Sequence, residues 1–468
     1  MGEVNVAVSA NAEELIRRLQ VALGLEAVVT GAAVAERAVS YWNSEPTRAR
    51  AILLPRSTAD VSAVLRLCHQ AGQPVVTQGG LTGCVVGAEA GPGDMILSLE
   101  KMSAIEEIDE VGGTCTVQAG AVLQVVQETV AEQGLLFPLD LGARGSCTIG
   151  GNVATNAGGI NVIRYGMMRN LVLGLEAVLP DGTVVSSMNR MLKNNAGYDL
   201  KQLFIGTEGT LGVVTRVVIR LFPAPVSSNS ALVAMDDFNN VTGLLSELQR
   251  DLAGTLSAYE VMWGEYFHAV TEPGWHRAPM NRDYPYYVML QAEGADPEFD
   301  KARFENLLEG ALESDRIVDA VIPKSDIENR SLWEIREDFE AILNPKPVYL
   351  YDVSLPIKDM DAYVKEVQAG VKARWPQGHC YVLGHIGDGN LHFFIAPKVE
   401  GDLHCEADRA VYEPLQQYGG SVSAEHGIGT EKLAWLGHCR SAEELGLMKL
   451  LKQTLDPKNL LNPGRVLP

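Results

Sequence analysis

Glycine is concentrated in three stretches of the first half of the chain, and this limits the folds that the chain can adopt. The stretches are VVTQGGLTGCVVGA (75–88), DLGARGSCTIGGNVATNAGG (140–159) and GTEGTLG (206–212). Glycine at this density lets backbone N–H groups approach a ligand closely, and runs of such groups bind anions such as a pyrophosphate. Tight turns are the alternative for any one stretch. The three together favour a nucleotide cofactor.

The form of these stretches argues against two common nucleotide sites. No GxGxxG opens a helix after a strand, so a Rossmann NAD site is not indicated, and the chain has no GxxxxGKS/T phosphate loop. The seven cysteines are scattered and never spaced CxxC, which predicts reduced thiols and no cysteine-ligated iron–sulfur cluster of usual spacing. If electrons move through this protein, we expect an organic cofactor to carry them.

Length and charge set the broad class of protein. A chain of 468 residues is too long for one ordinary core. Its 59 acidic and 38 basic residues give a net charge of −21, which argues against a nucleic-acid partner. The first residues lack the features of a signal peptide, and apolar stretches such as 213–222 are too short and too charged to span a bilayer. We therefore expect a cytoplasmic protein that is not integral to a membrane.

Alternating strand and helix patterns predict an α+β fold. Residues 52–80 have a strand–helix–strand pattern, with Ser57 and Asp60 at the helix start. The further strands that we expect lie at 94–99, 114–120, 173–185, 286–292, 348–356 and 379–386. The further helices lie at 236–252, 296–314 and 325–343, and in the tail from about 404. The Pro- and Ser-rich stretch 221–230 is typical of a linker, so the predicted domains are 1–225, 226–403 and 404–468.

Two histidines bracket a turn in GHIGDGNLHFF (384–394). The Gly-Asp-Gly sequence rules out a helix and predicts a hairpin that brings His385 and His392 to one face. The segment SVSAEHGIGTEK (421–432) adds a carboxylate, Glu425, directly before His426. Two histidines and one carboxylate leave an open position in a catalytic divalent-metal site. Strand histidines satisfied by ordinary hydrogen bonds are the alternative, and the nearby Glu425 and His426 favour the metal.

Four blocks of the sequence resemble the FAD-binding domain of the vanillyl-alcohol-oxidase-type flavoproteins. They are QGGLTG (78–83), PLDLGARGSCTIGGNVATNAGG (138–159), RYGMMRNLVLGLEAVLPDG (164–182) and NNAGYDLKQLFIGTEGTLGVVT (194–215). Within that superfamily the chain, from about residue 40 onward, is similar to the D-2-hydroxyacid dehydrogenases, which include D-lactate and D-2-hydroxyglutarate dehydrogenases and the glycolate oxidase flavin subunit. The resemblance implies a PCMH-type FAD-binding domain of two α/β subdomains, an α+β cap domain for the substrate and a helical C-terminal segment.

The resemblance also implies which residues bind the cofactor. Relatives with covalent FAD carry a histidine in the first loop, where this chain has QGGLTG, so we expect non-covalent FAD. Its pyrophosphate would lie on the backbone of Gln78, Gly79, Gly80, Thr82 and Gly83, with Leu81 in place of the asparagine frequent in relatives. The further implied cofactor contacts are Pro138, Asp140, Gly145, Thr148, Gly150, Gly151, Thr155, Asn156, Gly159, Glu208, Gly209, Gly212, Val213 and Asn462.

In the D-2-hydroxyacid dehydrogenases, HxGDGNxH and EHGxG motifs form the metal and catalytic centre, and both motifs are present here. The resemblance implies that His385, His392 and Glu425 hold Zn²⁺, or Mn²⁺ or Fe²⁺, and that His426 is the base. Arg336 matches the carboxylate-binding arginine of the family, although a solvated helix charge is the ordinary interpretation of an arginine in SLWEIREDFE (331–340). The metal would lower the pKa of the substrate hydroxyl while hydride passes to flavin N5.

The chain departs from relatives that are specific for dicarboxylates. They carry Thr, Lys and Asn where this chain has Glu340, Leu350 and Phe394. These replacements disfavour a second substrate carboxylate, because a buried unpaired charge is costly, although Lys346 could reach in instead. Asn390 is placed on the substrate side of the hairpin, whose turn it also shapes. We therefore expect oxidation of D-lactate or a longer apolar D-2-hydroxy monoacid.

Two alternatives remain from the sequence. The first is a D-2-hydroxyglutarate or D-malate dehydrogenase. The second is a non-catalytic flavin subunit of a glycolate-oxidase-like complex. For the enzyme, the expected electron acceptor is an electron-transfer flavoprotein, a quinone or a cytochrome, because the sequence has neither an iron–sulfur motif nor an NAD fingerprint.

Overall fold

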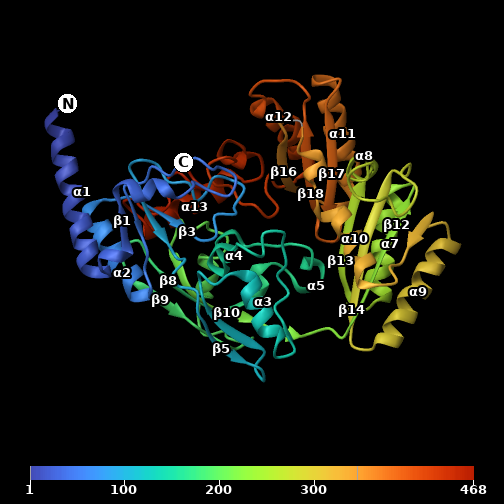
Figure 1. The fold of residues 1–468 in the computed structure, drawn as a ribbon, viewed down its shortest axis with the longest axis horizontal. Coiled ribbons are helices and arrows are strands. Elements are labelled where there is room, and N and C mark those ends of the chain that lie inside the picture. The colour runs from blue at the N-terminus through green and yellow to red at the C-terminus, as the bar shows by residue number, and fades with distance from the viewer. Residues whose placement is uncertain (1, 345) are drawn as a thin grey trace. The chain divides into compact units, whose positions relative to one another are not determined.

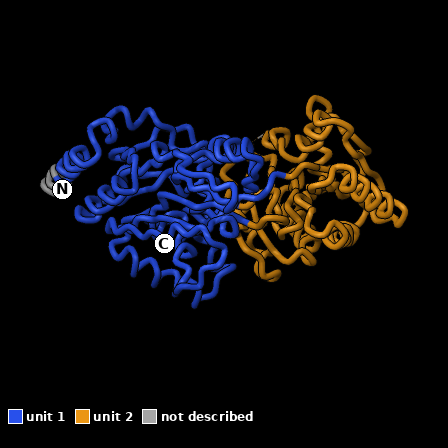
Figure 2. Tube along the Cα trace, turned by 90° about the horizontal axis from the view of Figure 1, so that it is seen from below, with its two compact units in different colours: residues 1–157, 167–224, 426–468 blue, residues 158–166, 225–425 orange. Residues whose placement is uncertain are grey.

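The chain folds into two compact units (Figure 2). The structure is a computed structural model that describes residues 2–344 and 346–468. Unit 1 extends to Ala157 and includes Met167–Ala224 and His426–Pro468. Unit 2 comprises Gly158–Gly166 and Pro225–Glu425. Both units are therefore assembled from segments that are far apart in the sequence.

Unit 1 contains two main sheets (Figure 1). The four-stranded sheet has the order β1-β2-β4-β3, and the five-stranded antiparallel sheet has the order β5-β6-β10-β8-β9. Strands β2, β4 and β3 are parallel. The strands are β1 (Val28–Thr30), β2 (Ala51–Leu53), β3 (Val75–Gln78), β4 (Met95–Ser98), β5 (Ile105–Asp109), β6 (Thr114–Gln118), β7 (Leu135–Leu136), β8 (Val172–Val178), β9 (Val184–Ser187), β10 (Val213–Arg220) and β11 (Phe222–Pro223). The helices are α1 (Gly2–Leu23), α2 (Thr58–Ala71), α3 (Leu123–Ala131), α4 (Ile149–Thr155), α6 (Met168–Leu171) and α13 (Ala442–Leu455).

The predicted strand–helix–strand of residues 52–80 is confirmed as β2, α2 and β3. Ser57 caps α2 because its side chain accepts a hydrogen bond from the Asp60 N–H, and Gly72 ends the helix in the left-handed conformation. The buried residues of α2 recur at helical spacing on one face: Val61, Val64, Leu65 and Cys68. This element places the glycine-rich loop directly after β3.

Unit 2 is built on one seven-stranded sheet with the order β15-β12-β14-β13-β17-β18-β16. Every neighbouring pair is antiparallel. The strands are β12 (Ser227–Met235), β13 (Leu256–Trp263), β14 (Tyr286–Gly294), β15 (Asp319–Val321), β16 (Tyr349–Ser354), β17 (His379–His385) and β18 (Asn390–Ala396). The helices are α5 (Val162–Tyr165), α7 (Phe238–Asp251), α8 (Gly264–Val270), α9 (Pro297–Glu313), α10 (Asp326–Glu337), α11 (Met360–Arg374) and α12 (His404–Leu415).

The two faces of this sheet are packed differently. On one face, Met262, Leu383 and Phe394 form an apolar core with residues of α8 and α10. On the other face, the Tyr259 hydroxyl donates to a carbonyl of α7, and the ring of Phe393 packs against a tyrosine of α11. Side chains alternate along a strand, so the face of α8 and α10 is the one that also receives residues 260, 385 and 392.

The structure corrects three details of the predicted organisation. Residues 227–230 of the predicted linker belong to β12, where they pair with residues 291–294. The predicted helix 325–343 ends at Glu337, because Asp338 adopts extended backbone. Residues 404–425 of the predicted third segment are part of unit 2, where the Tyr351 hydroxyl donates to Asp408 of α12. Among the described residues, no helix has the length and apolar character needed to cross a membrane.

Candidate active site

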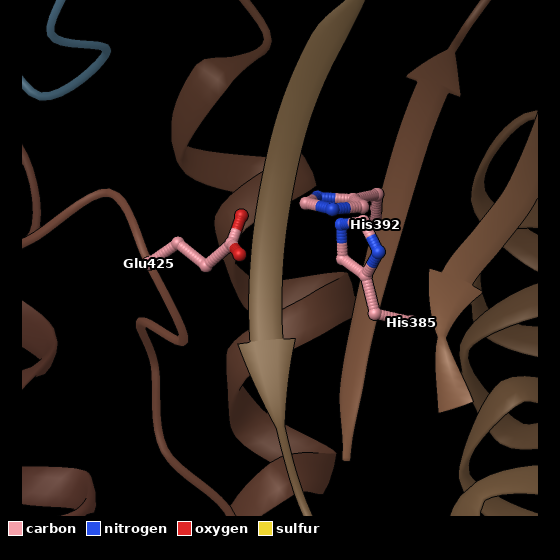
Figure 3. A group of neighbouring side chains, drawn as sticks. All are labelled: His385, His392 and Glu425. Atoms are coloured by element: carbon pink, nitrogen blue, oxygen red, sulfur yellow. The ribbon is translucent and has the colours of Figure 1, made fainter. Parts of the chain in front are cut away.

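The predicted hairpin is formed by β17 and β18, and it brings the two histidines together. His392 pairs with Leu383 across the hairpin, so His385 and His392 lie on the same face of the sheet. The two imidazole ring centroids are 5.3 Å apart. Figure 3 shows the carboxylate of Glu425 directed toward these rings. Ligand atoms of all three residues lie within 4.8 Å of one another, so the predicted metal-ligand set is assembled in unit 2.

Glu425 is held in place through its backbone and its carboxylate. Asp352, a fully buried residue of β16, accepts hydrogen bonds from the N–H groups of Ala424 (2.9 Å) and Glu425 (2.7 Å). The Gly159 N–H donates to Glu425 Oε1 at 2.6 Å. A Cβ atom on Gly158 would lie 2.6 Å from the same oxygen, so this close approach requires glycine. The structure therefore places Gly159, predicted to contact the cofactor, beside the metal-ligand set.

His385, Glu260 and Arg336 form a buried ion cluster, in which Glu260 contacts Nδ1 of the histidine ring. Glu260 of β13 is 1% exposed and pairs across strands with His385, whose Nδ1 lies 2.8 Å from Oε1 of the glutamate. Arg336 of α10 is 7% exposed. Its Nε donates to Oε2 of Glu260 at 2.9 Å, and its Nη2 forms an ion pair with the same oxygen at 2.7 Å. A solvated position for Arg336 is therefore excluded, and its side chain is directed toward the metal-ligand set.

The ion cluster shifts the pKa values of its members. Burial by itself lowers the pKa of His385, and the adjacent Glu260 carboxylate more than offsets this and raises that pKa to about 9. Burial also favours the neutral form of Glu260, but His385 and Arg336 outweigh it and lower the pKa of the carboxyl. Glu260 is therefore a carboxylate at neutral pH, although it lies in the interior.

The predicted substrate residues fall into three environments. Asn390 is 3% exposed, and neither its Oδ1 nor its Nδ2 has a hydrogen-bond partner among the described residues. Phe394 and Leu350 are cross-strand partners that pack in the apolar core, with the Phe394 ring 5.3 Å from that of Phe339. Glu340 is exposed at the start of a short 3-10 helix. An unsatisfied buried amide is unusual, because buried polar groups normally have a protein, water or ligand partner.

The loop after β3 in unit 1 is the predicted pyrophosphate site. A Cβ on Gly79 would clash with the Thr148 hydroxyl, and a Cβ on Gly80 would clash with the Ser146 carbonyl, whereas a Cβ on Gly83 would meet nothing within 4 Å. Leu81 adopts the left-handed conformation at φ +59°, so the loop presents its backbone. Two buried side-chain atoms near this loop, Gln78 Oε1 and Thr148 Oγ1, lack partners among the described residues. Of the two, the Thr148 hydroxyl can donate a hydrogen bond, so together with the open glycine backbone it fits the phosphate-bearing part of FAD, whereas Gln78 Oε1 can only accept.

Glu208 and Asn462 hold the loop that contains His426. The Glu208 carboxylate accepts hydrogen bonds from the N–H groups of Ile428 (2.6 Å) and Gly429 (2.7 Å). Burial raises the pKa of Glu208, and these two N–H groups offset part of the effect. Asn462 donates to the Glu208 carbonyl and accepts from the N–H of Thr77, the residue before Gln78. Within unit 1 these contacts join the predicted pyrophosphate loop to the loop of His426.

Other residues predicted to contact the cofactor contribute to packing in unit 1. A Cβ on Gly150 would lie 2.7 Å from the Cβ of Ala119, and a Cβ on Gly212 would lie 2.7 Å from the Phe204 ring. Val213 is buried at the start of β10, and Asn156 ends α4 in the left-handed conformation. The remaining predicted contacts lie in the loop before α4, in α4 and after Glu208: Pro138, Asp140, Gly145, Gly151, Thr155 and Gly209. Their contacts with FAD stay predictions.

Sequence reasoning missed Glu260, Asp352 and Gly158. The signal for the two acids was a lone carboxylate in an otherwise apolar strand, as in LSAYEVMW (256–263) and YLYDVS (349–354). A strand with this pattern is expected to lie in the core, so its carboxylate is buried too and needs a charged or hydrogen-bonding partner. The partners themselves could not be read, because they come from other parts of the chain.

Comparisons with known proteins agree with this architecture. Residues 49–187 match the FAD binding domain family, and residues 224–466 match the C-terminal domain of FAD linked oxidases. Among solved structures, p-cresol methylhydroxylase superposes with a TM-score of 0.75 at 16% identity, covering 97% of this chain and 96% of its own. Alkyldihydroxyacetonephosphate synthase superposes with a TM-score of 0.73 at 18% identity, covering 96% and 84%. Fold and site thus define an FAD-linked oxidoreductase of the PCMH type.

Curated relatives narrow the class. A probable mitochondrial D-2-hydroxyglutarate dehydrogenase of Oryza sativa subsp. indica is 40% identical over 422 residues, which are 89% of this chain and 75% of the relative. The D-2-hydroxyglutarate dehydrogenase of Xanthomonas citri pv. viticola is 39% identical, covering 91% and 90%. A putative mitochondrial D-lactate dehydrogenase of Schizosaccharomyces pombe is 36% identical, covering 91% and 83%. The chain belongs to the FAD-dependent D-2-hydroxyacid dehydrogenases.

The glycine loop yields a test of the cofactor site. Gly83→Ala should leave the melting temperature of the FAD-free protein unchanged, because its Cβ meets no protein atom within 4 Å, but should weaken FAD binding if the pyrophosphate lies there. Gly80→Ala should lower both the melting temperature and the FAD affinity, because its Cβ clashes with backbone. Such overpacking typically lowers the free energy of unfolding by about 1–3 kcal/mol. FAD affinity by fluorescence titration and melting by circular dichroism measure the two effects.

Gly93→Ala is the matched control, since Gly93 is exposed, has an ordinary φ and also meets no atom within 4 Å. This variant should keep the wild-type FAD affinity and the wild-type melting temperature. Wild-type FAD affinity in Gly83→Ala would contradict the placement of the pyrophosphate on this loop.

Proposed function

We propose that the protein oxidises a D-2-hydroxy acid with one carboxylate and an apolar tail, such as D-lactate or a longer homologue, to the 2-oxo acid. The proposal includes a divalent metal held by His385, His392 and Glu425. The observation that supports it most is the combination, within unit 2, of these three ligands with the buried Arg336 and the unsatisfied amide of Asn390. A 2-hydroxy acid offers this set a hydroxyl and a carboxylate.

Each group of the site has a role in this proposal. When bound, FAD supplies the hydride acceptor and a divalent metal supplies a Lewis acid. Arg336 binds the substrate carboxylate with the edge of its guanidinium that Glu260 leaves open, and the buried Asn390 amide orients the substrate by donating and accepting hydrogen bonds. His426 accepts the hydroxyl proton, which is general base catalysis.

The apolar preference rests on the neighbours of His392. Phe394 is two residues further along β18, on the same face, and Leu350 is its cross-strand partner. Lys346 is exposed, so it supplies no buried cation beside this pair, and Glu340, also exposed, is an acid. A second carboxylate placed against Phe394 would lose its hydration without gaining a partner. This costs roughly 3–5 kcal/mol for a buried unpaired charge, or about two to four orders of magnitude in kcat/KM.

D-2-hydroxyglutarate oxidation is the second candidate function. Several relatives at about 40% identity are named D-2-hydroxyglutarate dehydrogenases, which favours this function. The Schizosaccharomyces pombe relative is named a putative D-lactate dehydrogenase, which favours D-lactate. The two functions share the ligand set, the base and Arg336, and they differ only in what the substrate tail meets. For either function we propose an external electron acceptor, such as an electron-transfer flavoprotein, a quinone or a cytochrome, and a cytoplasmic location.

Anaerobic flavin reduction separates the two candidates. The purified flavoprotein is mixed with D-lactate, D-2-hydroxybutyrate, L-lactate or D-2-hydroxyglutarate, and the absorbance of oxidised flavin is followed in a stopped-flow instrument. We expect rapid bleaching by the two D-monoacids and little bleaching by the others. Faster bleaching by D-2-hydroxyglutarate would establish the second candidate. Absence of bleaching by every acid would refute both.

Removal of the metal tests the ligand set. Dialysis against a chelator should abolish flavin reduction by the preferred acid while FAD stays bound, because the predicted FAD cradle lies in unit 1 and the ligand set lies in unit 2. Readdition of Zn²⁺ or Mn²⁺ should restore the rate. His392→Ala should behave like the chelated protein but should not recover on readdition. Full activity in a metal-free preparation, verified by elemental analysis, would contradict the metal-dependent mechanism.

His426→Ala tests the base. Loss of a general base typically lowers the rate by about 10²–10⁴-fold, so flavin reduction should slow by this factor while FAD content and metal content remain at wild-type levels. His69→Ala, a histidine of α2 with no predicted role, is the matched control and should retain the wild-type rate. An unchanged rate in His426→Ala would show that another group accepts the proton.

A further inference from the structure

Glu260 is a charged residue in a strand that is otherwise suited to the core. All eight residues of β13 are buried, and Glu260 itself is 1% exposed. Burial of a carboxylate is strongly unfavourable unless cations or hydrogen-bond donors surround it. The contacts of this residue therefore account for its presence.

Both oxygens of the carboxylate are used. Oε2 accepts from Nε of Arg336 (2.9 Å) and forms an ion pair with its Nη2 (2.7 Å). His385 Nδ1 lies 2.8 Å from Oε1 and 2.7 Å from Oε2. All three residues belong to unit 2. One carboxylate thus contacts a metal-ligand histidine and the arginine assigned to the substrate carboxylate.

The contact with His385 fixes which ring nitrogen can bind a metal. A carboxylate only accepts hydrogen bonds, so the nitrogen beside it, Nδ1, carries a proton. The lone pair of the neutral ring is then on Nε2. Such a carboxylate–histidine pair orients a metal-binding ring and increases its basicity. The cross-strand pairing of residues 260 and 385 keeps the two side chains in register.

The contact with Arg336 fixes the plane of the guanidinium. Nε and Nη2 form one edge of the guanidinium and are both bound to Glu260, so the edge that contains Nη1 has a set direction. Among the described residues, no hydrogen bond from Nη1 is present. This is the edge that remains for an anionic ligand.

We infer that Glu260 is a positioning residue that aligns the metal site and the substrate clamp with each other through a single carboxylate. The inference rests on the proposed function, because it uses the roles given there to His385 and Arg336. Stability alone does not explain the cluster, since replacement of buried ion pairs by apolar residues of similar volume is often neutral or stabilising. A function that needs two groups oriented together does explain it.

The experiment measures Zn²⁺ affinity and does not depend on turnover. Metal-stripped wild-type flavoprotein and Glu260→Gln are titrated with Zn²⁺ in competition with a chromophoric chelator. Gln keeps the shape but presents an amide, so the affinity should fall by about 10–100-fold, the usual effect of losing such a partner. FAD content should stay at the wild-type level. In the metal-loaded enzyme the KM for the preferred acid should rise because the guanidinium of Arg336 is no longer held.

Glu293→Gln is the matched control. Glu293 is a partly buried carboxylate of the same sheet, in β14, and it pairs with Arg164 instead of with a metal ligand. This variant should bind Zn²⁺ like the wild type. Equal Zn²⁺ affinity in wild type and Glu260→Gln would overturn the inference. If Glu260→Gln does not fold, Glu260→Asp decides: its carboxylate is one methylene shorter, so severalfold weaker Zn²⁺ binding is expected and unchanged binding overturns the role.

The same titration separates this inference from the proposed function. A wild-type protein that binds no Zn²⁺ would refute the metal centre, and the role of Glu260 with it. A wild-type protein that binds Zn²⁺ tightly, together with a Glu260→Gln variant that does so equally, would leave the metal centre in place and remove only the role of Glu260.

Discussion

The antiparallel register of β13, β17, β18 and β16 is the constraint on which the site depends. In this register Glu260 is opposite His385, and His392 is opposite both Leu383 and Asp352. A shift of one residue in any strand would turn its functional side chains to the opposite face. The core fixes the register, because alternate residues of the same strands, such as Val382 and Phe393, are fully buried on the side of α11.

A polar row therefore crosses the sheet face that also carries the apolar core of α8 and α10, and pairing makes this possible. Glu260 is satisfied by the Arg336 guanidinium and by His385 Nδ1, and Asp352 by two backbone N–H groups. Asn390 departs from the rule, since its amide is buried and has no partner among the described residues. Local departures from good packing or pairing concentrate at functional sites, where a ligand supplies what the protein does not.

The parts of the site that depend on neighbouring residues could be predicted from the sequence. The hairpin of His385 and His392 follows from a Gly-Asp-Gly turn between two apolar strands. The role of Glu260 could not be predicted, because its partners are 76 and 125 residues away. Gly159 illustrates the same limit. The family resemblance implied a cofactor contact for Gly159, and the structure places its N–H against Glu425, 266 residues later.

The separation of 266 residues between Gly159 and Glu425 affects when the site can form during synthesis on the ribosome. Gly159 leaves the ribosome long before Glu425, and at about 5–20 residues per second the delay is roughly 13–53 s. During this interval the sheet of the unit to which Gly158–Gly166 belongs is still being synthesised. Its glycines and its short helix α5 therefore lack their native contacts until the later residues have been synthesised. The metal-ligand set is complete only after nearly the whole chain has emerged, so a ribosome-bound nascent chain shorter than about 425 residues has no such site.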